Sequence, residues 1–171
     1  ETEPSPSLGN ISGRGKMRVL VACEFSEIVK EQFLLRGHDA HSCDLLPGEK
    51  GLKNHHQCDV SLLLNESWNL LIAHPPCTFL ANSGVRWLYK DGKRADRWEL
   101  MKAACVFFNS LLNAPIAHIA VENPIQHKWA RQIIPIYSQI IQPYQFGHGE
   151  TKATCLWLRN LPLLKPANIV S

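Results

Sequence analysis

Short apolar runs and stretches of helical spacing alternate along this chain. Residues 18–23 and 68–73 are dominated by aliphatic side chains, which is typical of strands buried on both faces. Residues 26–36 and 97–113 space their apolar side chains as one face of a helix does, and Gly37 marks the end of the first helix. Strands are predicted at residues 18–23, 39–44, 68–73, 118–121, 137–142 and 154–159, while residues 58–64 fit either a short strand or the start of a helix.

Strands that alternate with helices predict an α/β fold, a mostly parallel Rossmann-like sheet with helices on both faces. The polar residues 45–57 are predicted to form a loop, and a short helix or turn is expected up to about residue 134. In such sheets ligands bind outside the carboxyl ends of the strands. Polar residues follow four predicted strands, at residues 24–27, Asp44, residues 74–77 and Glu122-Asn123, so we expect them to share one pocket.

Composition indicates one globular domain. The chain has 171 residues, of which 45% are hydrophobic and 19% charged, and this balance excludes a disordered chain. Residues 1–16 are rich in Pro, Ser and Gly and are expected to be a leader or tag, so the folded domain is predicted to span residues 17–171. The sequence shows no membrane span and no secretory signal, so we expect a cytoplasmic protein whose six cysteines are mostly free thiols.

Cys77 and Glu122 are the strongest candidates for chemistry. Pro75 and Pro76 end a strand abruptly and would present Cys77 at a rigid corner, where a nucleophile could act. Glu122 ends another apolar strand and could donate a proton to a ring nitrogen. Taken alone, each has a structural alternative: a small thiol beside a turn for Cys77, and a helix-capping acid for Glu122.

Two further groups of residues are candidates for ligand binding. Residues 20–26 together with Asp44 and Asp59 form a nucleoside-binding corner, in which the acids would hold ribose hydroxyls and an amino group. Basic side chains with interleaved aromatic rings suit phosphate contact and base stacking. The segment after Cys77 supplies them as Arg86, Trp87, Lys90, Lys93, Arg94 and Arg97.

Histidines and cysteines lie close together in residues 41–43 and 55–58. His41, Cys43, His55, His56 and Cys58 could bring four zinc ligands together. Their spacing is irregular and two of them fall in a predicted strand, so we predict no metal site.

In this order the motifs resemble the cytosine-C5 DNA methyltransferase family, and in particular its short phage-type members. Residues 21–26 resemble the first cofactor motif of that family, residues 69–77 its nucleophile motif and residues 121–123 its Glu-Asn-Val motif. Residues 146–154 are similar to its Gln-x-Arg-x-Arg segment, with Lys152 at one of the basic positions. The chain departs from the family at Glu27, where a glycine is usual, and at His74, where small residues are usual.

The resemblance implies a class I methyltransferase sheet and S-adenosyl-L-methionine as cofactor. It implies that the Cys77 thiolate adds to C6 of cytosine in DNA while Glu122 assists at N3, with Asn123 orienting the loop and Lys152 steadying the pocket or binding phosphate. The cofactor would be held by Glu24, Phe25, Ser26, Asp44, Asp59 and Pro75. The cell would be bacterial or phage-infected.

Two alternatives stay open. The chain could modify a free pyrimidine nucleotide, which the absence of a target-recognition region from residues 159–171 favours. It could instead be an inactive nucleic-acid-binding relative of the fold, which Glu27 favours. Either another chain supplies target recognition, as a separate subunit or in a homo-oligomer, or the substrate needs no long sequence readout.

Overall fold

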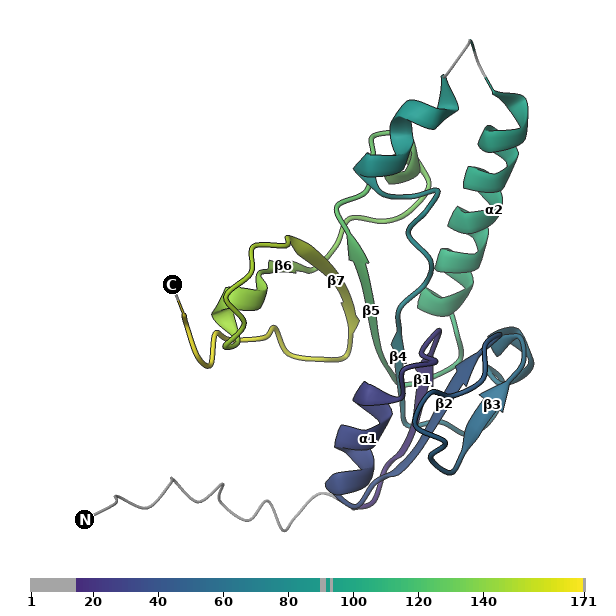
Figure 1. Ribbon diagram of the computed structural model, residues 1–171. Coiled ribbons are helices and arrows are strands. Elements are labelled where there is room, and N and C mark those ends of the chain that lie inside the picture. The colour runs from purple at the N-terminus through teal and green to yellow at the C-terminus, as the bar shows by residue number, and fades with distance from the viewer. Residues whose placement is uncertain (1–14, 90–91, 93, 171) are drawn as a thin grey trace.

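One mixed sheet organises the part of the chain that this computed structural model describes, residues 15–89, 92 and 94–170 (Figure 1). Its seven strands lie in the order β3-β2-β1-β4-β5-β7-β6. The strands are β1 (Arg18–Ala22), β2 (Asp39–Asp44), β3 (His55–Gln57), β4 (Leu70–Ala73), β5 (His118–Pro124), β6 (Gln139–Ile141) and β7 (Thr154–Arg159).

The sheet is parallel at its centre and antiparallel at one edge. β1 pairs in parallel with β2 and β4, and the parallel pairing continues outward to β3 and to β5. β7 then runs antiparallel between β5 and β6. The predicted mostly parallel sheet is therefore confirmed in part: parallel pairing joins five strands, and β7 alone runs in the opposite direction, so that both of its pairings are antiparallel.

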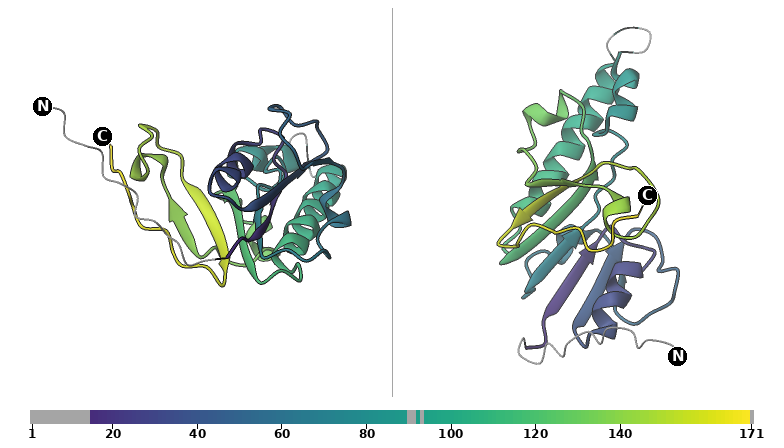
Figure 2. Two further views of the ribbon diagram at one scale, coloured as in Figure 1. Left: turned by 90° about the horizontal axis from the view of Figure 1, so that it is seen from below. Right: turned by 90° about the vertical axis from the view of Figure 1, so that its left-hand side faces the viewer.

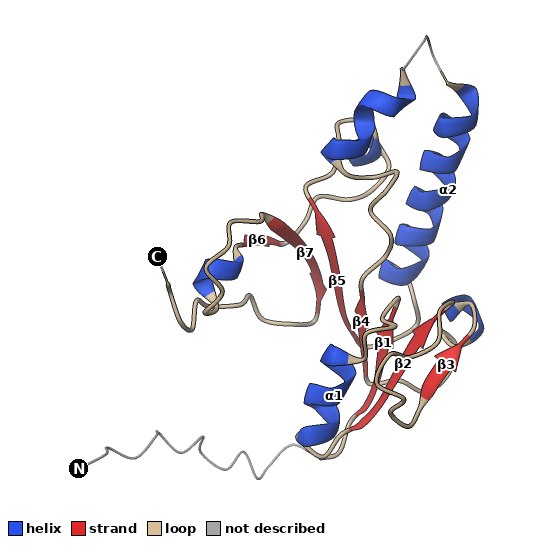
Figure 3. Ribbon diagram, in the orientation of Figure 1, coloured by secondary structure: helices blue, strands red, loops and turns tan. Residues whose placement is uncertain are grey.

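The two α-helices cover opposite faces of this sheet (Figures 2 and 3). Helix α2 (Ala95–Leu112) packs Met101, Cys105, Phe108 and Leu111 into the larger core, against side chains such as Leu20, Leu71 and Ile119. Helix α1 (Ile28–Leu35) covers a smaller cluster on the other face, formed by Val19, Val21, Ala40 and Leu70. Alternate residues of β1 thus face different helices, as the period of a strand requires.

Strand β3 corrects the predicted loop over residues 45–57. Its residues are polar, and hydrogen bonds rather than apolar packing hold it at the sheet edge: the Ser42 amide donates to the Asn54 carbonyl at 3.0 Å, and Ser42 Oγ lies 2.8 Å from His55 Nδ1. A polar edge strand carries no hydrophobic alternation, so its sequence does not distinguish it from a loop.

Short 3₁₀ helices connect several strands. The ambiguous residues 58–64 contain η1 (Val60–Leu62), and the turn expected after β5 contains η3 (Ala130–Gln132). η2 (Asn82–Leu88) follows β4, and η4 (Pro143–Gln145) follows β6. η2 and η3 both contact α2, on the side of the molecule away from β6.

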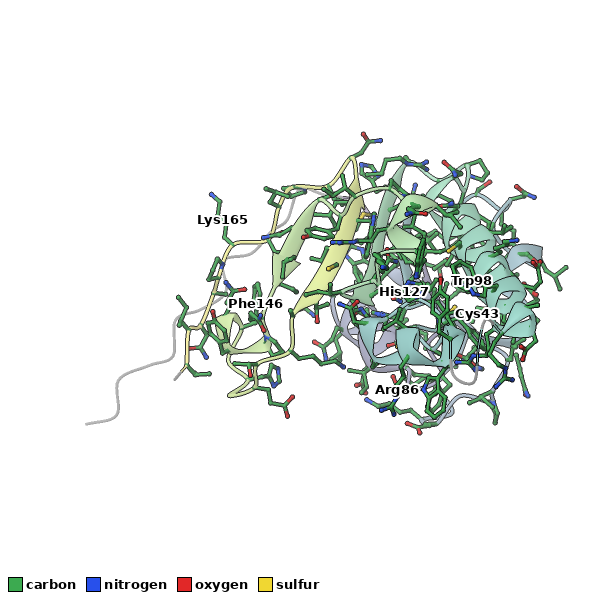
Figure 4. All side chains as sticks on the ribbon, turned by 90° about the horizontal axis from the view of Figure 1, so that it is seen from above. Cys43, Arg86, Trp98, His127, Phe146 and Lys165 are labelled. Carbon is green, nitrogen blue, oxygen red and sulfur yellow. The ribbon has the colours of Figure 1, made fainter. Side chains whose placement is uncertain are left out.

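The chain after β7 turns back along β6 and η4. The Gln139 side chain exchanges hydrogen bonds with the Leu164 backbone at 2.7 and 2.9 Å, and Phe146 forms a bridge with Asn168. Figure 4 shows Phe146 and Lys165 on this side, well apart from Arg86 and Trp98. The predicted leader, residues 1–16, lies almost wholly outside the described residues.

No helix among the described residues has the length and apolar character that crossing a bilayer requires.

Candidate functional site

Most of the predicted site residues lie at or just after the carboxyl ends of the five parallel strands. Directly after β1 the backbone turns sharply, with Cys23 and Glu27 both at φ 58°. Residues other than glycine rarely adopt this left-handed conformation, and it costs roughly 1–3 kcal/mol where it occurs. Between these two positions, the buried carboxylate of Glu24 accepts the amide N–H groups of Val29 and Lys30 at 2.5 and 3.2 Å. Glu24 therefore satisfies the first turn of α1.

Glu27 adopts the left-handed backbone conformation that favours glycine, and its side chain is buried in the protein. Its carboxylate is completely buried and lies 2.5 Å from the equally buried Nζ of Lys30. It also accepts the backbone N–H groups of Lys50 at 2.7 Å and Leu52 at 3.4 Å. A Cβ on Gly48 would lie 2.7 Å from this carboxylate, so only glycine allows the loop to approach so closely. Glu27 thus anchors the β2–β3 loop.

A cavity of about 200 Å³ opens at the ends of β1, β2 and β3. Its walls bring together the two predicted cofactor-binding acids, Asp44 and Asp59, from the ends of neighbouring strands. Pro76, from the segment after β4, closes it on another side. The lining residues are Cys23, Cys43, Asp44, Leu45, Cys58, Asp59, Val60, Pro76 and Phe107.

The charge in this cavity belongs to the acids and not to the thiols. Burial, reinforced by the carboxylates of Asp44 and Asp59, raises the pKa of Cys23 to about 12. Burial and the neighbouring Cys58 raise the pKa of Cys43 to about 12 as well. Hydrogen bonds from Ser61 lower the pKa of Asp59. Near neutral pH a mainly apolar cavity therefore presents carboxylates, which suit a ligand with hydroxyl and amino donors.

The motifs after β4 and β5 are joined side by side. His74 Nδ1 lies 3.2 Å from Glu122 Oε2, and the Asn123 side chain donates from Nδ2 to the Pro75 carbonyl at 2.7 Å. Asn123 is buried, whereas His74 and Glu122 keep 30% and 32% of their side chains exposed. Asn123 thus fixes the start of the segment that carries Cys77.

Cys77 begins a tight turn. Its carbonyl accepts the amide N–H groups of Leu80 and Ala81, both at 2.9 Å. The next helix, η2, packs against this turn so closely that a Cβ on Gly84 would lie 2.5 Å from the Thr78 carbonyl oxygen. The partly exposed Cys77 side chain lines an open cavity of about 480 Å³, which it shares with Thr78, Ser83, Gly84, Trp87 and Arg97. The predicted nucleophile and two of the predicted nucleic-acid contacts therefore meet in one hollow.

The described basic residues of this segment differ in their surroundings. The Arg97 guanidinium stacks on Phe79 at 4.7 Å, and that of Arg86 on Trp87 at 4.8 Å. Arg94 forms an exposed ion pair with Asp96 at 2.8 Å. Lys90 and Lys93 lie outside the described residues.

Several predicted site residues lie away from both cavities. Glu122 does not line the Cys77 cavity, and Lys152 is exposed just before β7. Phe25 is partly exposed, and its carbonyl accepts the Glu49 amide at 2.9 Å. None of Glu24, Phe25, Ser26 and Pro75 lines the Asp44/Asp59 cavity, in which Pro76 takes the place expected for Pro75.

The zinc alternative does not assemble in the part of the chain that the structure describes, where no group of three or more His, Cys, Asp or Glu side chains could hold a metal ion. His41 stacks on His56, with 2.8 Å between ring nitrogens. His55 instead contacts Ser42 and the Leu46 carbonyl. The six cysteines are free thiols.

Sequence reasoning missed three contributors. Cys23, directly after β1, and Phe107 of α2 line the Asp44/Asp59 cavity, and His74 holds Glu122. The position of His74 directly before the Pro-Pro pair was a usable signal, because it brings a titratable ring beside the next strand. Nothing in the sequence around Phe107, an apolar position in a helix, distinguishes it from the core.

Comparisons with known proteins add little to this geometry. No family model matches the chain, and no curated protein matches it. Among solved structures the chain is similar to one described as a co-crystal structure of WbdD and the kinase inhibitor LY294002. The TM-score is 0.43 and the sequence identity 9%, over 83% of this chain and 36% of that chain. A likeness of this strength carries no functional argument.

Proposed function

We propose that this protein is an S-adenosylmethionine-dependent methyltransferase that acts on C5 of cytosine in DNA through a covalent Cys77 adduct. The observation that carries the proposal is the position of the Pro76-Cys77 dipeptide. Pro76 lines the cavity of Asp44 and Asp59, and Cys77, the next residue, lines the cavity of Trp87 and Arg97. A cofactor in the first cavity and a base in the second would approach each other at this dipeptide.

The first cavity fits the adenosyl part of the cofactor. Asp44 can accept from ribose hydroxyls and Asp59 from an adenine amino group, between apolar walls such as Val60 and Phe107. Glu27, which stands at a usual glycine position, is turned into the protein and does not line this cavity. The strand order, with an antiparallel seventh strand between the fifth and sixth, is also the one that a class I methyltransferase sheet has.

The second cavity supplies the covalent chemistry. The Cys77 thiolate would add to C6 of the ring, and Glu122 would donate a proton or a hydrogen bond to N3 as charge develops there. When bound, S-adenosylmethionine supplies the methyl group that C5 accepts. Departure of the C5 proton and expulsion of the Cys77 thiolate then restore the aromatic ring. In duplex DNA the base must first leave the stack, which costs a few kcal/mol.

In the proposed mechanism, Glu122 turns from His74 toward the base. It lies at the end of β5, held by His74 at 3.2 Å, and its neighbour Asn123 is bonded to the backbone of the Cys77 segment. A change of the Glu122 rotamer on substrate binding would bring the carboxyl group from His74 to the ring. Catalytic hydrogen bonds often form only in the substrate complex.

One observation favours a second candidate, an inactive nucleic-acid-binding relative. The Glu24 carboxylate occupies the first amide N–H groups of α1, where a helix would otherwise receive an anionic ligand group. In that case the Trp87 and Arg97 cavity would still bind DNA. Calorimetric titration with S-adenosylhomocysteine separates the two candidates, because the inactive relative gives no heat with this ligand and still binds DNA.

The proposal is tested by methyl transfer from labelled S-adenosylmethionine. Cytosine-containing DNA and dCMP serve as parallel acceptors, and the variants are Cys77→Ser, Glu122→Gln and the exposed control Ser67→Ala, which lines neither cavity. We expect transfer to DNA, its loss in Cys77→Ser, a decrease of about 10²–10⁴-fold in Glu122→Gln and little change in the control. Transfer that survives Cys77→Ser unchanged would contradict the mechanism, and transfer to dCMP alone would change the substrate.

A further inference from the structure

A third cavity is lined by residues that follow β5 and by Trp157 of β7. It has a volume of about 250 Å³, somewhat below the range for sites of drug-sized ligands, and so has room for one ring system with its substituents. Its lining combines polar, cationic, aromatic and aliphatic side chains: Gln126, Arg131, Ile134, Tyr137 and Trp157, with Pro135 and Ile136 at its mouth. Neither of the two cavities described above includes any of these residues.

Gln126 is the unusual member of this lining. Only 3% of its surface is exposed, and its Nε2 is buried without a hydrogen-bond partner among the described residues. Leaving a buried donor unpaired costs roughly 1–3 kcal/mol, so buried amides without partners are uncommon. A side-chain amide that lines a cavity in this state is suited to pair with an acceptor on a ligand.

The other walls suit the remaining parts of a nucleotide. Trp157 is fixed by its Nε1 hydrogen bond to the Pro135 carbonyl at 2.7 Å, and Tyr137 stands edge-on to it with the ring planes at 89°. These rings and Ile134 offer apolar contact to a base. The exposed Arg131 at the rim carries the charge and planar donors that match a phosphate.

We propose that this cavity is a nucleotide-binding subsite, with the base paired to the Gln126 amide and the phosphate held by Arg131. The same chemistry fits a free nucleoside monophosphate and one nucleotide of a strand that also reaches the Cys77 cavity. The site is distinct from the methyl-transfer site proposed above, and binding to it needs neither the adenosyl ligand nor the Cys77 thiol.

The position of Gln126 couples this subsite to the Cys77 turn. The backbone of Gln126 forms an antiparallel bridge with Ala81, whose amide N–H donates to the Cys77 carbonyl at 2.9 Å. The buried ring of His127 adds a second tie, with Nε2 2.9 Å from the Phe79 carbonyl oxygen. An occupant that orders Gln126 therefore also orders the segment that carries the nucleophile.

Calorimetric titration of the full chain tests the subsite, with CMP, AMP, adenosine and a single-stranded pentanucleotide as probes. All titrations contain saturating S-adenosylhomocysteine and are repeated in Arg97→Gln, so that binding in the other two cavities is recognised. The variants are Gln126→Leu and Arg131→Gln. Their matched controls are Gln132→Leu and Lys128→Gln, which remove the same groups from exposed neighbours that do not line the cavity.

We expect Gln126→Leu to weaken binding of every probe by about tenfold or more, because it removes the paired amide. Arg131→Gln should weaken CMP and AMP but leave adenosine, which has no phosphate, unchanged. A response with CMP and AMP identifies free nucleotides as ligands, and a response with the pentanucleotide alone identifies a strand. Should Gln126→Leu not fold, the contrast between AMP and adenosine in Arg131→Gln decides. Affinities that do not differ from those of the controls would overturn the subsite.

Discussion

Glu27 and Lys30 form a buried ion pair that also holds the β2–β3 loop. Both side chains are completely buried, and each also bonds to the backbone of the β2–β3 loop: Glu27 to Lys50 and Leu52, and Lys30 Nζ to the Lys53 carbonyl at 3.0 Å. A buried ion pair gains little over an apolar pair, but removing one partner strands the other charge. The pair therefore makes the loop conformation specific.

Replacing one member of the pair should be far more damaging than replacing both. We expect Lys30→Met to lower the free energy of unfolding by about 3–5 kcal/mol, because Glu27 remains buried without its cation. The double variant Glu27→Gln/Lys30→Met should recover a large part of this loss. Urea denaturation followed by circular dichroism measures both, and Lys102→Met, an exposed lysine of α2, is the control. Equal losses in the single and double variants would contradict this account.

The same pair predicts a dependence of stability on pH. Burial alone would raise the pKa of Glu27, but the hydrogen bonds from Lys30 and from the Lys50 and Leu52 amides outweigh it and lower the pKa. A carboxyl whose pKa is lower in the folded protein contributes stability above its unfolded pKa of about 4.3, and this contribution is lost as pH falls through the folded value. The stability difference between the wild type and Glu27→Gln/Lys30→Met should therefore shift against the wild type as the pH is lowered below about 4. A difference that stays constant with pH contradicts the lowered pKa.

The strands and helices show which parts of the fold a sequence can reveal. β1 and β4 are buried on both faces and could be located from their aliphatic runs, as could α2 from its apolar stripe. β3 could not, because its stability comes from edge hydrogen bonds to β2. The reversed direction of β7 is likewise set by tertiary pairing, since a single strand carries no mark of its direction.

Site residues follow the same division. Asp44 could be placed from its position at the end of a predicted strand and Asp59 from the predicted nucleoside-binding corner, and they line one cavity. The turn after β4 could not be predicted in the same detail, because two successive prolines leave open which of them lines the cavity. In the structure it is Pro76. The contact of Glu122 with His74 depends on the register of β4 against β5, which the sequence does not specify.

The packing of η2 against the Cys77 turn yields a prediction about Gly84. A Cβ at this position would lie 2.5 Å from the Thr78 carbonyl oxygen, so Gly84→Ala must push η2 away from the turn. We expect a stability loss of about 1–3 kcal/mol and weaker DNA binding, since Trp87 would move with η2. Gly149→Ala is the matched control, because a Cβ there has no neighbour within 4 Å. Thermal denaturation and DNA titration should separate the two, and two variants with the same behaviour would show that the close approach is unimportant.

In the molecule as a whole, the Asp44/Asp59 cavity and the Cys77 cavity both follow the carboxyl ends of parallel strands. From β1 the chain adds β2 and β3 on one side of the sheet, and then β4 and β5 on the other side of β1. Ligands of open α/β sheets bind at such a switch point between neighbouring strands. The Asp44/Asp59 cavity lies on the β1 side of this point, and the Cys77 cavity follows β4. Because α1 and α2 cover the two faces of the sheet, the carboxyl ends of its strands stay accessible between the helices.

Occupancy of the Asp44/Asp59 cavity should therefore stabilise the whole molecule, since its walls come from β1, the ends of β2 and β3, the segment after β4 and α2. A ligand that binds only the folded state adds RT ln(1 + [L]/Kd), about 2.7 kcal/mol at a concentration of 100 Kd. We expect S-adenosylhomocysteine to raise the melting temperature of the wild type and of Asp39→Asn, whose acid lies at the opposite end of β2. In Asp44→Asn the increase should shrink or vanish, because the neutral amide holds ribose hydroxyls less strongly than a carboxylate does. An equal increase in Asp44→Asn and Asp39→Asn would place the adenosyl ligand elsewhere, and an unchanged wild type would favour the nucleic-acid-binding relative over the enzyme.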